Sequence, residues 1–108
     1  ADMAGSDFVV LGTIETYEFK LDKSIVAPGT TGAQTINKTA GAVNLAASAT
    51  SLVVTNSYVD TDSVIIATVA SNDSTMTSVQ VVAASGSFTI YPDSAPTAET
   101  RVNFMVVN

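Results

Sequence analysis

Residues 79–108 read VQVVAASGSFTIYPDSAPTAETRVNFMVVN, and this stretch decides the fold class. Two runs within it place apolar residues at every second position, and these residues are Phe88, Ile90, Val102, Phe104 and Val106. Successive side chains of a β-strand point to opposite faces, so this spacing directs one face into a core. Pro92 ends the first run, because proline is not accommodated in the middle of a sheet. The stretch therefore predicts two strands with Phe88 and Phe104 pointing inward.

The same rhythm extends upstream. Further apolar runs occupy residues 43–45, 52–54, 64–69 and 79–82, and turn-forming residues such as Asn72-Asp73 and Ser85-Gly86 separate them. Short strands at regular intervals with turns between them are typical of antiparallel all-β domains. The sequence predicts an all-β fold, a single antiparallel β-sandwich or a β-barrel of jelly-roll type. Both architectures have the same strand rhythm, so both stay open at this point.

The N-terminal part of the chain follows a different pattern. We expect residues 1–12 to form an N-terminal arm and residues 13–108 to form a single β-sandwich domain. The arm contains a short apolar run at residues 8–11, and the alternation over residues 13–19 predicts a strand. Ala27-Pro28-Gly29 predicts a turn, because proline fixes φ and glycine adopts positive φ without steric cost.

Composition excludes several classes of function. Only four of the 108 residues are basic and ten are acidic, so the net charge is −6. Binding to nucleic acid through phosphate groups, or to an anionic membrane, needs a basic patch that this chain does not have the residues to build. Cysteine is absent, which removes disulfides and thiol chemistry. Charged residues make up only 13% of the chain, so its polar surface is mostly Ser, Thr and Asn.

Catalytic and metal-binding patterns are equally scarce. The chain has no histidine, the usual general base near neutral pH and the commonest metal ligand. Glu15 and Glu18 are three residues apart, which places them on opposite faces of a strand. Asp60-Thr61-Asp62 has a calcium-loop spacing but is read as a turn, because the glycine and the distal glutamate of a full loop are missing. We expect no enzymatic activity, no catalytic residues, no cofactor and no metal site.

A resemblance to a known class of proteins adds a functional hypothesis. It rests on the overall residue pattern and the spacing of residues 42–57, 64–69, 72–75, 86–90 and 95–108. These segments resemble small β-rich modules of tailed-bacteriophage virions, and the whole chain with its short arm resembles head-decoration, or cement, proteins. The resemblance implies a structural virion protein on the outer capsid surface. It also implies a homotrimer that binds the major capsid protein and holds the shell against internal DNA pressure.

Two functional hypotheses follow. The first is capsid decoration, with partner contacts predicted at Asp7, Phe8, Val9, Val10, Leu11, Tyr17 and Phe19. An exposed strand edge there would add a strand to a neighbouring protein. The alternative is a receptor-binding or adhesion module of a tail fibre or head fibre. The contact surface would then lie in the Ser/Thr/Asn-rich loops at residues 55–63 and 71–77, although the chain has few aromatic residues and no tryptophan.

Overall fold

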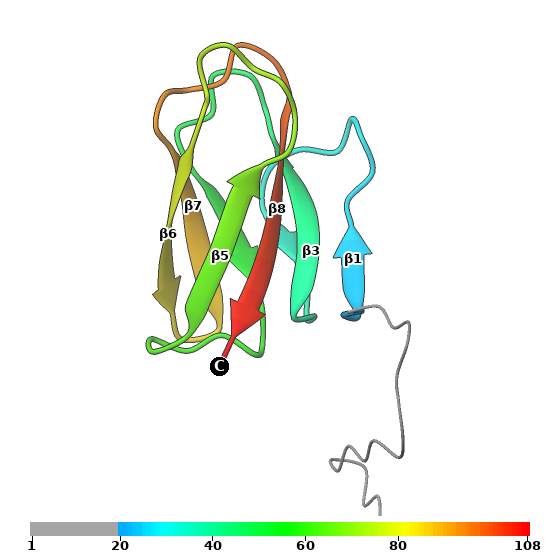
Figure 1. Ribbon diagram of the computed structural model, residues 1–108, viewed down its shortest axis with the longest axis vertical. Coiled ribbons are helices and arrows are strands. Elements are labelled where there is room, and N and C mark those ends of the chain that lie inside the picture. The colour runs from blue at the N-terminus through cyan, green and yellow to red at the C-terminus, as the bar shows by residue number, and fades with distance from the viewer. Residues whose placement is uncertain (1–19) are drawn as a thin grey trace, which may run out of the picture.

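The computed structural model describes residues 20–108, and these form eight β-strands and no helix (Figure 1). The strands are β1 (Lys23–Ile25), β2 (Gln34–Thr35), β3 (Ala40–Leu45), β4 (Leu52–Thr55), β5 (Val64–Val69), β6 (Val79–Ala84), β7 (Ser87–Pro92) and β8 (Thr100–Val107). The all-β prediction is therefore confirmed. The predicted arm and the predicted strand over residues 13–19 lie outside the described residues. Within residues 20–108 no helix has the length and apolar character needed to cross a membrane.

The strands form two four-stranded sheets that pack as a sandwich. One sheet has the order β1-β3-β8-β5 and the other has the order β2-β4-β7-β6. No strand belongs to both sheets, so the structure favours the sandwich over the closed barrel. The pairs among β3, β8 and β5 and among β4, β7 and β6 are antiparallel, as predicted.

Two pairs near the N-terminal side differ from that pattern. β1 runs parallel to β3, and β2 runs parallel to β4. The chain crosses to the opposite sheet between the two members of each pair, so the second member returns in the direction of the first. Both sheets are therefore mixed. The alternation of apolar residues along one strand could not predict this, because it gives no information about the direction of the neighbouring strand.

The core lies between the sheets and is lined by the predicted inward positions. Phe88 on β7 and Phe104 on β8 are buried, and their rings meet edge to face. The alternating burial of β4 and β8 has the period of two expected for strands with one face in the core. Pairs of aromatic rings prefer this edge-to-face geometry, because the positive edge of one ring faces the negative face of the other.

β3 departs from simple alternation because both of its faces are covered. Ala42 and Asn44 point away from the core, yet they are as buried as their inward neighbours Val43 and Leu45. The turn that follows β1 folds over this outer face, and the amide of Asn44 binds it. That turn contains the predicted Ala27-Pro28-Gly29 segment, and Gly29 has a φ of 93°.

Candidate interaction surface

The polar side chains of the described residues mainly hold loops in place. Asn44 is the clearest case, because its Nδ2 lies 3.0 Å from the carbonyl oxygens of both Ala27 and Thr30 and 3.4 Å from that of Val26. Among residues 20–108, no buried side-chain nitrogen or oxygen lacks a hydrogen-bond partner. A buried polar group that lacks a hydrogen-bond partner lowers stability. The paired amide of Asn44 therefore has a structural role.

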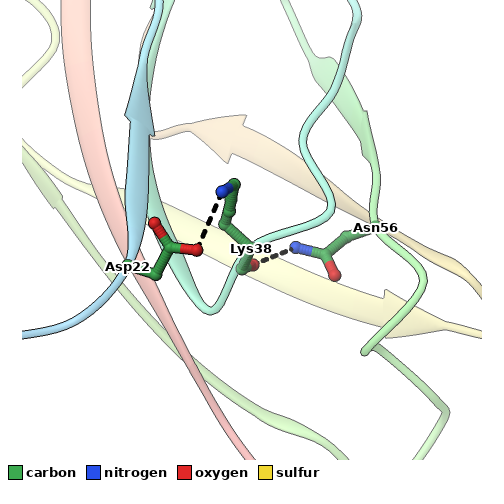
Figure 2. Close-up of polar contacts among 3 residues, drawn as sticks. All are labelled: Asp22, Lys38 and Asn56. Carbon is green, nitrogen blue, oxygen red and sulfur yellow. Dashed lines mark hydrogen bonds and ion pairs between the residues drawn. The ribbon is translucent and has the colours of Figure 1, made fainter.

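A second polar group ties the start of β1 to the rest of the fold. The Nζ of Lys38 lies 2.8 Å from Oδ2 of Asp22, and the backbone carbonyl of Lys38 accepts a 2.7 Å hydrogen bond from Nδ2 of Asn56 (Figure 2). Asn56 is completely buried, and its Oδ1 accepts from the N–H of Tyr58. The hydrogen bond with Asp22 and the negative charge of that carboxylate raise the pKa of Lys38. Three separate segments are thus fastened where the chain enters the sandwich.

Two aspartates fasten the loops at the far end of the sandwich. Asp73 accepts hydrogen bonds from the N–H groups of Met76, Thr75 and Thr97 and from Oγ1 of Thr97. These bonds stabilise the ionised form and hold the pKa of Asp73 well below its ordinary value.

Asp93 fastens the neighbouring loop in the same way. It accepts from Oγ1 and the N–H of Thr77 and from the N–H groups of Ser78 and Ser94. The bond from the Thr77 hydroxyl contributes most to lowering its pKa. Both carboxylates are therefore occupied in joining the β5–β6 connection to the β7–β8 connection.

The segment with calcium-loop spacing forms a turn in the structure. Oδ1 of Asp60 accepts a 2.8 Å hydrogen bond from the N–H of Asp62, and the N–H of Asp60 donates to Oγ of Ser63. This is the local bonding that aspartate makes in a turn. Residues 20–108 contain no group of three acidic, histidine or cysteine side chains close enough to hold a metal ion.

The outer faces of both sheets expose large apolar side chains. On the first sheet these are Ile25, Val64, Ile66 and Val107, and on the second they are Val53, Val82 and Tyr91. Val53 and Val82 lie in one row across β4, β7 and β6, because both are opposite Thr89. Surfaces of this kind are typical of contacts between proteins.

The predicted contact residues and loops are placed as follows. Asp7, Phe8, Val9, Val10, Leu11, Tyr17 and Phe19 all lie outside the described residues. The loops proposed for receptor binding, at residues 55–63 and 71–77, lie at opposite ends of β5 (Figure 1). A six-residue strand separates them by about 20 Å, so they do not form one continuous contact surface.

The exposed apolar residues were not among the predicted contacts, although one signal for them was present. Residues 64–66 are Val-Ile-Ile, an unbroken apolar run in which a half-buried strand would alternate. Such a run places apolar side chains on both faces of β5.

Comparisons of the chain with models of known families, with curated proteins and with solved structures give no match.

Proposed function

We propose that this chain is a structural virion protein, a decoration protein that binds the outer surface of a phage head and stabilises it. The observation that supports this proposal is that apolar side chains are exposed on both outer faces of the sandwich. The aspartates of the loops, by contrast, are occupied in binding backbone N–H groups. A surface with few charges loses little solvation energy when it is covered by another protein.

The attachment to the shell would run through the N-terminal part of the chain. β1 begins at Lys23, close to the N-terminal residues 1–19 in sequence, and is an edge strand of its sheet. It has three residues and pairs with β3 on one side, and within residues 20–108 no strand pairs with its other side. Main-chain hydrogen bonds at such an edge give affinity. Ile25, the last residue of β1, supplies exposed apolar area.

The proposal assigns stabilisation to many copies acting together. A single short edge gives modest affinity, but a shell offers the same site to many copies of the chain. If the chain binds the assembled shell and not the separated shell subunits, each bound copy shifts the assembly equilibrium of the shell toward the assembled state. The major capsid protein is therefore the partner we assign, with contacts from residues 7–11, Tyr17 and Phe19.

The first test is the number of copies of this polypeptide per purified virion, measured by quantitative mass spectrometry against the major capsid protein. A number close to that of the shell subunits supports decoration. A few copies, or a few dozen, would place the protein in the tail or fibres and overturn the proposal.

The second test concerns the arm. Full-length chain is sedimented with heads that lack it, beside a variant that begins at residue 12 and a control variant that begins at residue 7. We expect the control to bind as the full chain does, because it keeps the apolar run Phe8–Leu11, and the shorter variant to remain in the supernatant. Equal binding of all three would show that the arm does not attach the protein.

A further inference from the structure

β5 is an edge strand without the features that usually protect an exposed edge. Its six residues are Val-Ile-Ile-Ala-Thr-Val, with no charge, no proline and no glycine. It pairs with β8 on one side, and among residues 20–108 no strand pairs with its other side. Natural proteins usually block such edges with lysine, proline or a bulge, because an open edge recruits another strand.

The ladder fixes which main-chain groups point outward from β5. The N–H of Ala70 donates a 2.7 Å hydrogen bond to the carbonyl of Arg101, which continues the β5–β8 ladder by one residue. Alternate residues of an antiparallel strand direct their N–H and C=O to opposite sides. The even-numbered residues therefore face β8, and the main-chain groups of Ile65 and Ala67 point away from the sheet.

Apolar side chains surround this open edge. Val64 is 58% exposed, Ile66 is 53% exposed and Val107, opposite Val64 on β8, is 43% exposed. The inward-pointing residues are also incompletely covered, since Ile65, Ala67 and Val69 on β5 and Val79, Val81 and Ala83 on β6 are only partly buried against the core. An added strand would cover both sets at once.

We infer that β5 pairs antiparallel with β5 of a second copy of this chain, about a two-fold axis that passes beside Ile66. The pairing joins the first sheets of the two copies into one continuous sheet. Residues that face each other across a strand pair must lie on the same face of the sheet. This register places Ile66 opposite Ile66 of the second copy and Val64 opposite Thr68 of the second copy.

The charges at the two ends of β5 favour this direction of pairing. Asp62 lies in the turn before β5, and Arg101 lies beside Ala70 just after β5 ends. Antiparallel pairing brings the turn over residues 60–63, which contains Asp62, of each copy to the end of β5 beside Arg101 in the other copy, about 10 Å or two strand spacings away. The side chain of Arg101, whose Nε donates to Oδ1 of Asn103, is long enough to span most of that distance once it turns toward the second copy. Parallel pairing would instead place Asp62 beside Asp62, and it would leave the two Arg101 residues about 14 Å or three strand spacings apart.

This arrangement differs from the homotrimer that the resemblance to decoration proteins implies. A pair of β5 edges related by a two-fold axis is closed, because each copy uses the same strand and no β5 edge remains for a third copy. The mass of the oligomer therefore separates the two arrangements. The inference does not depend on attachment to a capsid.

The test is the mass of the full chain by light scattering on a sizing column, across a series of concentrations. We expect a species of twice the 11.0 kDa chain mass. Ile66→Lys places two lysines opposite each other and should reduce the mass to that of one chain. Val82→Lys is the matched control, because Val82 is 58% exposed where Ile66 is 53% exposed but lies on the other sheet, and it should leave the dimer intact.

Three further variants test the register and the charges. Ile66→Cys should form a disulfide-linked dimer on mild oxidation, since the chain contains no other cysteine. Asp62→Arg should weaken the dimer, and adding Arg101→Asp should restore it. A monomer or trimer at every concentration, or a dimer unaffected by Ile66→Lys, would overturn the inference.

Discussion

Phe88 and Phe104 join the two sheets by a ring contact across the core, with centroids 4.9 Å apart and planes inclined at 61°. Each ring belongs to a central strand, β7 in one sheet and β8 in the other. Neither residue is close to the other in sequence, so the contact forms only when the sheets pack. Loss of either ring should therefore weaken the packing between the sheets.

Phe88→Ala should lower the free energy of unfolding by about 3–5 kcal/mol, because it removes a fully buried ring and leaves a cavity. Domains of this size are stable by only about 5–15 kcal/mol, so the variant will be close to unfolding. Urea denaturation followed by circular dichroism measures the change. Tyr91→Ala, on the outer face of the same strand, is the control and should cost far less. Equal losses would mean that the ring contact is not central to stability.

Asn44→Ala should cost about 1–3 kcal/mol, because it leaves carbonyl groups of the covering turn without their donor. The turn at residues 26–30 should then open more often than the whole protein unfolds. Limited proteolysis measures this, with faster cleavage expected inside that turn. Asn72→Ala is a suitable control, because Asn72 is exposed in another loop. An unchanged cleavage rate in Asn44→Ala would refute the role assigned to the amide.

These two side chains also show what the sequence reveals and what it leaves hidden. Phe88 was predicted to be in the core because its neighbours alternate, and alternation depends only on local geometry. Asn44 also sits in an alternating run, at a position that local geometry assigns to solvent. Its burial depends on the turn at residues 26–30, outside the alternating run, which folds over β3. The parallel pairing of β1 with β3 and of β2 with β4 was hidden for the same reason, because each is a relationship between separate segments.

The exposed apolar residues of β5 also show that local sequence does not determine which strands become neighbours. The run Val64-Ile65-Ile66 indicated that both faces of β5 are apolar, but a central strand and an open edge strand have similar sequences. Only the strand order shows that β5 is at an edge. The predicted contacts near the N-terminus lie outside the described residues, and they stay predictions.

Asn56→Ala and Asp22→Asn should differ sharply, although both residues belong to the group around Lys38. Asn56 is fully buried, and its loss leaves the Lys38 carbonyl and the Tyr58 N–H without partners, at a cost of about 1–3 kcal/mol for each. The ion pair of Asp22 is largely exposed and screened by solvent, so its loss should cost much less than the loss of Asn56. Thermal unfolding of the two variants side by side measures the difference. A larger loss for Asp22→Asn would reverse this ranking.

The stability of the fold should fall in acid through Asp73 and Asp93. Both carboxyl groups have a folded-state pKa below the ordinary value, because N–H and hydroxyl groups bind their ionised forms. The unfolded chain therefore takes up protons first as the pH falls, so the stabilisation is complete above the ordinary aspartate pKa of about 4 and is lost below it. Salt should change this little, since the partners are hydrogen-bond donors held at short range.

Asp73→Asn should flatten the acid side of the stability curve, because the amide has no charge to lose and cannot accept as many N–H groups as the carboxylate. It should also reduce stability at neutral pH, where wild-type Asp73 is ionised. Urea midpoints from neutral pH down to acid measure both effects, with Ser74→Ala as the control in the same loop. If Asp73→Asn kept the full stability of the wild type at neutral pH, the hydrogen bonds to Met76, Thr75 and Thr97 would not be what joins the loops at this end of the sandwich.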